Sequence, residues 1–136
     1  MANEAVIVEL IGKVPGCPIN YTVADGVGIE KGTIMYVDDA RLAVAHSGID
    51  QPIIGIAAAE KVASDGSTTL AVYTNGIFDI TAAAAGATAI GAICAPSATA
   101  NMFTPADGDD LLQGSTIGQL YEAADNDEIA LVRVLK

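Results

Sequence analysis

The sequence has few basic and few aromatic residues, and each shortage argues against a class of function. Six Lys and Arg stand against 17 Asp and Glu among 136 residues, which gives a net charge of −11 at pH 7. Phosphate backbones and anionic lipid head groups repel such a chain, so we expect no direct nucleic-acid partner and no membrane partner. Tryptophan is absent and there are only four Tyr and two Phe. This disfavours a glycan-binding module, which presents exposed aromatic rings.

The sequence also has no long apolar run, and its first residues are not expected to be a secretory leader. The longest apolar stretch, residues 82–95, is shorter than the ~20 residues that a membrane helix needs, and glycine and threonine interrupt it. Residues 1–10 contain two glutamates and alternate in polarity, which does not fit a secretory signal, so we expect synthesis in the cytoplasm. In that setting Cys17 and Cys94 are expected to be buried apolar side chains or free thiols rather than a disulfide.

The dominant pattern in the sequence is a two-residue alternation of apolar and polar side chains, which is typical of strands. Clusters of Gly, Asp, Asn, Ser and Pro separate the alternating segments. Short strands at this spacing predict a mainly β fold, a small β-barrel or sandwich with at most one or two short helices. Strands are predicted at residues 5–11, 19–24, 33–37, 42–46, 53–62, 68–73, 77–80, 90–95, 100–103, 117–123 and 128–135.

Two local motifs give sharper predictions. Asn75-Gly76 lies between two apolar segments, and because both central positions of a type I′ turn need positive φ, this pair predicts a tight hairpin. Thr81, followed by four alanines and Gly86, has an N-cap residue, good helix formers and a C-terminal glycine. It predicts a helix of little more than one turn.

The two halves of the chain resemble each other, which predicts an internal repeat. Each half has a hairpin, an Ile-Gly step and a second hairpin, in which an acidic turn leads to a closing apolar strand. Gly55 and Gly118 occupy the equivalent step, where a missing side chain permits a bulge or the sharp corner that closes a small barrel. The alternative is a coincidental likeness among β segments of low diversity. The matching segments are residues 32–45 and 91–104, residues 54–60 and 117–123, and residues 70–73 and 129–132.

His46 is the only histidine, and it is the main candidate for catalysis. A small hydrolase would need a thiol, from Cys17 or Cys94, beside the imidazole and a third group to orient the ring. The alternation from Leu42 onward places His46 on the apolar side at the end of a strand. We therefore expect a structural or interface histidine and no catalytic residue.

Two loops are candidate ligand sites. Residues 26–33 contain three glycines and a lysine, but the spacing is not that of a phosphate-binding loop, so no nucleotide cofactor is expected. Asp107-Gly-Asp-Asp110 is followed by Gly118 where an EF-hand requires its final glutamate. We expect no metal and no other cofactor here, and interpret this loop as a solvated turn, with an irregular cation site as the alternative.

Four segments in fixed order carry a resemblance to a known family. They are residues 27–37, with Val27-Gly-Ile-Glu-Lys-Gly-Thr at their start, residues 51–59, residues 70–80 and residues 88–92. In this order the chain resembles the small capsid decoration, or cement, proteins of tailed bacteriophages and related viruses. The resemblance covers nearly the whole chain.

The resemblance implies a virion structural protein rather than an enzyme. It implies a compact β domain, made in the host cytoplasm, that forms a homotrimer and binds the outside of an icosahedral head. There it bridges adjacent subunits of the major capsid protein and stabilises the shell. The alternatives are an adhesive or glycan-binding virion module and the small His/Cys hydrolase.

The N-terminal segment is the predicted contact element. We divide the chain into an arm, residues 1–17, and a single β-rich decoration domain, residues 18–136. The arm is apolar on both faces of its expected strand, so residues 2–12 are expected to be disordered alone and to engage the capsid or a neighbouring subunit. Should the arm prove an integral strand, the contact is sought first at residues 106–114. The candidate contact residues are Glu4, Val6, Val8, Leu10 and Ile11.

Overall fold

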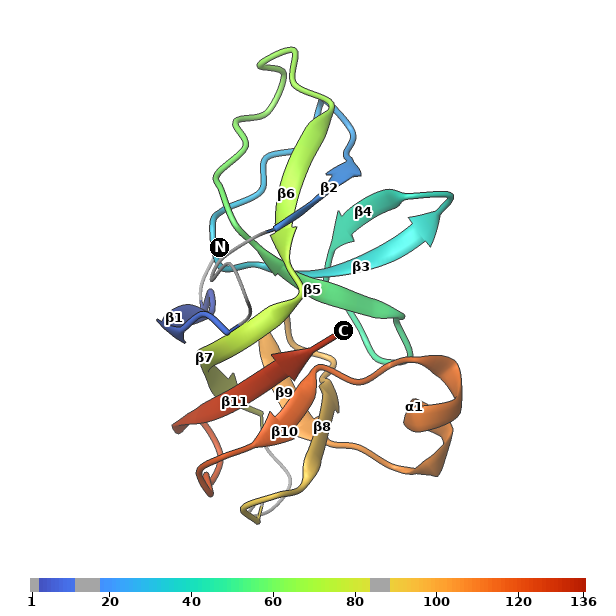
Figure 1. Ribbon diagram of the computed structural model, residues 1–136. Coiled ribbons are helices and arrows are strands. Elements are labelled where there is room, and N and C mark those ends of the chain that lie inside the picture. The colour runs from blue at the N-terminus through green and yellow to red at the C-terminus, as the bar shows by residue number, and fades with distance from the viewer. Residues whose placement is uncertain (1–2, 12–17, 84–88) are drawn as a thin grey trace.

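The computed structural model describes residues 3–11, 18–83 and 89–136, which fold into two β-barrels joined end to end (Figure 1). Every predicted strand overlaps an observed one, so the mainly β class is confirmed. The first barrel contains β2 (Ile19–Thr22), β3 (Ile34–Asp39), β4 (Leu42–Ala45), β5 (Ile53–Ala57) and β6 (Thr69–Tyr73). The second contains β7 (Asn75–Ala82), β8 (Ile93–Pro96), β9 (Met102–Pro105), β10 (Gly118–Leu120) and β11 (Ile129–Leu135). Strand β1 (Val6–Glu9) and the short helix α1 (Gly108–Gln113) complete the described chain.

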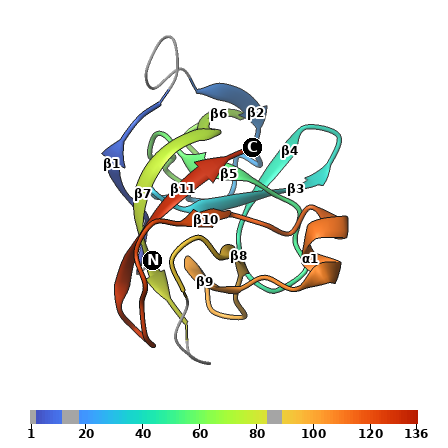
Figure 2. The ribbon, with the colours of Figure 1, turned by 60° about the horizontal axis from the view of Figure 1, so that its bottom comes forward.

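The two barrels have the same topology, which confirms the internal repeat. In each, the first strand pairs in parallel with the third (β2 with β4, β7 with β9) and antiparallel with the fifth (β2 with β6, β7 with β11). The second strand pairs with the third and the fourth, and the fourth pairs with the fifth. Figure 2 shows the second barrel from the end that Figure 1 places at the bottom.

Gly55 and Gly118 occupy equivalent positions in these barrels. Gly55 pairs with Met35, and Gly118 pairs with Cys94 at the matching place in the second barrel. A Cβ atom on either glycine would overlap a backbone carbonyl oxygen of the neighbouring strand, that of Tyr73 for Gly55 and that of Arg133 for Gly118. Both barrels therefore need glycine here so that two strands can approach closely.

Each barrel has its own core, and the second core extends into the first barrel. Val23, Met35 and Val72 belong to the cluster inside the first barrel. The larger cluster fills the second barrel around Phe78 and Phe103, and it also includes Ile34 and Ile56 of the first barrel. The two barrels therefore pack through shared apolar side chains.

A buried polar network also joins the barrels and contains His46. The side chain of Asn101, in the second barrel, accepts a hydrogen bond from the Ile34 backbone N–H (2.9 Å). His46 is 1% exposed; its Nε2 lies 2.9 Å from the carbonyl oxygen of Ser97, and its Nδ1 accepts from the Asn101 backbone N–H (3.1 Å). His46 is thus a structural residue between the barrels, as predicted.

The predicted Asn75-Gly76 hairpin is wrong. Strands β6 and β7 belong to different barrels, and Asn75 and Gly76 lie inside β7, opposite Leu135 and Val134 of β11. A Cβ atom on Gly76 would lie 2.9 Å from the carbonyl oxygen of Glu9. The glycine therefore permits the close approach of β1 and does not form a turn, a distinction that a local motif does not contain.

The predicted helix at Thr81–Gly86 is also wrong at its start. Thr81 and Ala82 continue β7 and pair with β9; residues 84–88 lie outside the described chain. The observed helix is α1, where Asp107 accepts hydrogen bonds from the backbone N–H groups of Asp109 and Asp110 in a capping box. The acidic segment predicted as a turn is thus a helix start. No helix of the described chain has the length and apolarity needed to cross a membrane.

The N-terminal segment forms an edge strand on its own chain. β1 pairs antiparallel with residues Ile77–Asp79 of β7, and Ala5 is buried in the core of the second barrel. This site is open because β7 pairs with β9 only at Thr81 and Ala82. The expectation that residues 2–12 are disordered alone is therefore wrong for β1, which pairs within its own chain.

Candidate functional site

The outward side of β1 exposes two large apolar side chains. Val6 and Val8 are 60% and 50% exposed. Strand register places Val6 beside Asp79 of β7 and Leu131 of β11, so these side chains share the outer face of the sheet. We call this surface the arm face. It consists of Val6, Val8, Ile77, Ile129 and Leu131.

The other predicted contact residues lie differently. Leu10 packs against the core and is half-buried, as is Ile11. The reason is a bulge between Ile7 and Glu9, which shifts the alternation of the strand so that Leu10 no longer shares the side of Val6 and Val8. Glu4 is half-buried, and this burial raises the pKa of its carboxyl group. Only Val6 and Val8 of the predicted set therefore present large apolar surface.

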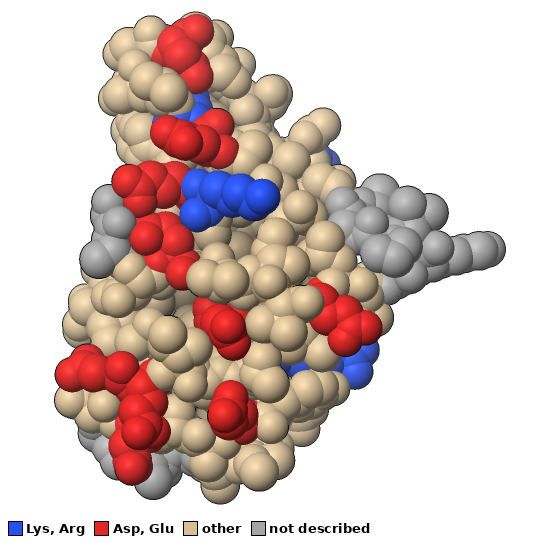
Figure 3. Space-filling model, turned by 90° about the vertical axis from the view of Figure 1, so that its left-hand side faces the viewer, with Lys and Arg blue, Asp and Glu red and all other residues tan. Residues whose placement is uncertain are grey.

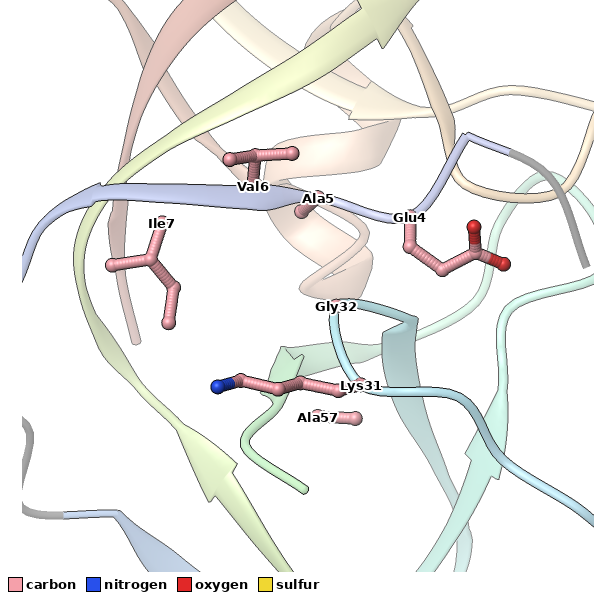
Figure 4. Close-up of a pocket in the computed structure, with 7 residues that line it drawn as sticks. All are labelled: Glu4, Ala5, Val6, Ile7, Lys31, Gly32 and Ala57. Carbon is pink, nitrogen blue, oxygen red and sulfur yellow. The ribbon is translucent and has the colours of Figure 1, made fainter. Parts of the chain in front are cut away.

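A cavity of about 520 Å³ lies between β1 and the turn that precedes β3. Figure 4 shows Lys31 extended beneath β1 with its ammonium group toward Ile7, whereas the carboxylate of Glu4 points away from it. Lys31 forms no ion pair with any residue that the structure describes. The pocket is a mixed polar and apolar hollow beside the arm face.

Acidic groups are dispersed on this side of the molecule. Figure 3 views the side on which β1 lies and shows several small groups of acidic side chains, one of them beside a basic side chain, on a largely uncharged surface. Such a surface keeps an apolar-rich protein soluble while leaving uncharged areas between the acids.

A second apolar surface lies on the second barrel, beside α1. A groove of about 310 Å³ runs between the helix and β8, β10 and β11. Leu111 and Leu112 of α1 are 55% and 88% exposed, and α1 contains no buried residue. We call this surface the groove face. It consists of Ile93, Leu111, Leu112, Gln119, Arg133 and Leu135.

The groups considered for catalysis are engaged elsewhere. Burial lowers the pKa of His46, which favours neutral imidazole. Since Nδ1 accepts a hydrogen bond from Asn101, Nε2 carries the proton and donates it to the carbonyl oxygen of Ser97. Burial raises the pKa of the Cys94 thiol to about 12, and its Sγ donates to the Gly118 carbonyl oxygen at 3.4 Å. Cys17 lies outside the described residues.

The acidic loop offers no arrangement for a cation. Asp107 and Asp110 use carboxylate oxygens to cap α1. Within residues 3–11, 18–83 and 89–136, no group of three or more His, Cys, Asp or Glu side chains is placed to hold a metal ion.

Sequence reasoning missed the groove face, although a pattern in the sequence marks it. In β11, Ala130, Val132 and Val134 point into the core, while Leu131 and Leu135 point outward. This is the same two-sided apolar alternation that singled out the N-terminal segment, and it was equally visible in residues 129–135. The leucines of α1 fall within residues 106–114, the segment predicted to make the contact if the N-terminal arm proved an integral strand.

Comparisons with known proteins identify the family of this chain. A search of curated proteins finds no match to this sequence. A family model described as phage cement protein matches residues 14–135, which include both barrels and α1. With nearly its whole length matched, the chain belongs to the phage cement protein family.

Proposed function

We propose that this cement protein decorates the outside of an icosahedral head and stabilises it by bridging major capsid subunits through its arm face. The carrying observation is the exposure of Val6 and Val8, 60% and 50%, on a strand whose other side packs into the core. A strand apolar on both sides has one side left for a partner. Membership in the family supports a capsid as that partner.

Charge supports the outer surface of the shell as the binding side. With a net charge of −11, the protein is repelled by the packaged nucleic acid inside a head. Synthesis in the host cytoplasm would bring the folded protein to the assembled shell from outside.

A homotrimer supports bridging. Three arm faces on one particle make the second and third contacts effectively intramolecular, so contacts that are weak alone give durable attachment. The role proposed is structural and not catalytic, a view supported by the engagement of both His46 ring nitrogens with backbone groups.

The test measures how much protein binds to heads that lack it. Purified protein is titrated onto such heads, and copies per head are counted by gel densitometry alongside the resistance of the heads to heat. The double variant Val6→Thr/Val8→Thr keeps the β-branched shape but adds two hydroxyl groups that the contact would bury. We expect its affinity for heads to fall about 30- to 100-fold.

Val27 and Val62 give a matched control. They are 50% and 61% exposed, like Val8 and Val6, but they lie on the first barrel. Val27→Thr/Val62→Thr should bind like wild type. The proposal is wrong if wild-type protein does not bind or stabilise the heads, or if both double variants bind equally well.

A further inference from the structure

Because the two barrels repeat each other, the surface that joins them has a counterpart on the second barrel. In the first barrel, Ile34, Ile56 and Tyr73 lie side by side on β3, β5 and β6. Their neighbours Met35 and Val72 fill the first barrel, so this row points outward. Ile34 and Ile56 are 0% exposed because the second barrel covers them.

The equivalent row of the second barrel is open. Ile93, Gln119 and Arg133 lie side by side on β8, β10 and β11, at the positions of Ile34, Ile56 and Tyr73. Ile93 is 41% exposed, whereas Ile34 is fully buried. The surface of the first barrel that the second barrel covers therefore has an equivalent on the second barrel. This equivalent surface is uncovered in the described chain.

The composition of this row is that of an intermolecular contact. Gln119 and Arg133 stand where the first barrel has Ile56 and Tyr73. These polar side chains allow the row to be exposed to water. The Arg133 guanidinium makes one hydrogen bond within the described chain, from Nη1 to the Tyr121 hydroxyl (3.3 Å), and its buried Nε has no partner. A guanidinium with one such hydrogen bond can still bind a carboxylate of a partner through its outer N–H groups.

Helix α1 adds apolar side chains that no described residue of the chain covers. The first barrel has no helix between β4 and β5, at the place where the second barrel has α1. A helix of six residues with none buried is marginal alone. Its exposed Leu111 and Leu112 would be covered by a body lying on the groove face.

We propose that the groove face binds the first barrel of a second copy of this chain, head to tail. The proposal deepens the homotrimer of the proposed function and rests on it. The same barrel-on-barrel contact that joins the two halves of one chain then repeats from one chain to the next. Such a contact is heterologous, and a rotation of one third of a turn from copy to copy would close it into the ring of three that the proposed homotrimer requires.

Charge complementarity supports this partner. Arg133 and Lys136 give the groove side two cations in a strongly acidic protein, and the Lys136 ammonium is held at its rim by the Thr116 carbonyl oxygen (2.7 Å). On the first barrel, Lys61 is buried and Arg41 donates to the Asn20 carbonyl oxygen. The first barrel exposes more acids than cations, its exposed cations being Lys31 and Arg41. Asp38, Asp39, Asp50 and Glu60 are among the exposed acids that a partner can reach.

The test is the mass of the purified protein in solution, which needs no heads. Light scattering at protein concentrations from about 1 to about 100 µM detects the dissociation of a trimer whose dissociation constants lie in that range. Wild type should have three times the 13.7 kDa chain mass. Arg133→Glu replaces attraction by repulsion, and we expect a dissociation constant at least 100-fold higher. Leu112→Ser, at a side chain 88% exposed, should weaken the trimer about 10-fold without touching the core.

Two controls isolate the groove face. Lys31→Glu makes the same charge change beside β1, and Ile129→Ser removes a side chain 62% exposed at the other end of β11. Both should remain trimers, and all variants should keep the wild-type circular dichroism spectrum. A wild type that is monomeric or dimeric throughout, or variants Arg133→Glu and Leu112→Ser that both remain trimeric, would overturn the proposal. Head binding by Val6→Thr/Val8→Thr tests the proposed function separately, so the two failures are distinguishable.

Discussion

Replacing Gly118 by alanine tests the packing of the second barrel through a single methyl group. Gly118 lies in β10 opposite Val134 of β11, and its φ is not in the left-handed region. Alanine is therefore acceptable to the backbone, and any effect comes from contact alone. The added Cβ would overlap the carbonyl oxygen of Arg133 and lie 2.7 Å from its carbonyl carbon.

The cost follows from what must move. Cβ atoms essentially never approach other atoms within 3.0 Å, so β10 and β11 would have to separate by roughly 1 Å. That movement weakens a ladder of three residue pairs, a loss of about two hydrogen bonds at ~1 kcal/mol each. Repacking around the fully buried Leu120 adds ~1–3 kcal/mol. We expect Gly118→Ala to lower the free energy of unfolding by about 3–5 kcal/mol, a large share of the 5–15 kcal/mol typical of a domain.

Urea denaturation followed by circular dichroism measures this change. Gly48→Ala is the matched control, because a Cβ atom there meets nothing within 4 Å and its φ is not left-handed. It should change the free energy of unfolding by less than about 0.5 kcal/mol. Gly55→Ala, at the equivalent step of the first barrel, should cost at least as much as Gly118→Ala, because its φ of 148° adds backbone strain. A Gly118→Ala protein as stable as Gly48→Ala would refute the close approach of the two strands.

Three further changes test other parts of the fold. Burial holds the pKa of His46 below its ordinary 6.5. The unfolded chain therefore takes up a proton that the folded chain excludes, and the free energy of unfolding should fall as the pH drops below about 6.5. In urea titrations at several pH values His46→Gln should remove that part of the decline, and an unchanged pH profile would contradict this. Lys61→Met leaves the carbonyl oxygens of Asp25 and Val62 without their ammonium donor and should lower the free energy of unfolding by about 2–4 kcal/mol. Lys31→Met, at an exposed lysine, should lower it by less than about 0.5 kcal/mol. Equal urea midpoints for the two variants would show that the Lys61 contacts do not stabilise the barrel. Asp107→Ala removes the N-cap of α1, so it should lower the free energy of unfolding by about 1 kcal/mol and speed amide hydrogen exchange in the helix. Asp107→Ser should keep the stability and the exchange rates of the wild type. Equal exchange rates in the two variants would argue against the cap.

Local patterns in the sequence determined the strands and the repeat. Period-two alternation is a property of a strand by itself, since successive side chains point to opposite faces. It therefore located every strand of both barrels, and the matched order of the two halves predicted their common topology. The sequence also singled out Gly55 and Gly118, as sites of a bulge or a barrel corner. The close approach of neighbouring strands at both glycines came from the structure.

Tertiary structure decided which strands pair, and there the local motifs failed. Asn75-Gly76 has the composition of a hairpin turn, yet β7 leaves β6 to begin the second barrel, where pairing with β11 over seven residues outweighs one turn preference. Thr81 begins a good helix sequence but continues that same pairing. Strand β1 finds its place because β9 covers only the far end of β7.

The candidate surfaces show the same division. The sequence identified Val6 and Val8 from two-sided apolarity, a local property. The groove face required the fold, because only β-sheet register brings Ile93, Gln119 and Arg133 into one row beside α1. Whether that row is covered or open depends on which barrel carries it. The first barrel's row is covered by the second barrel, whereas the second barrel's row is open among the described residues, and that asymmetry arises from packing between elements far apart in the sequence.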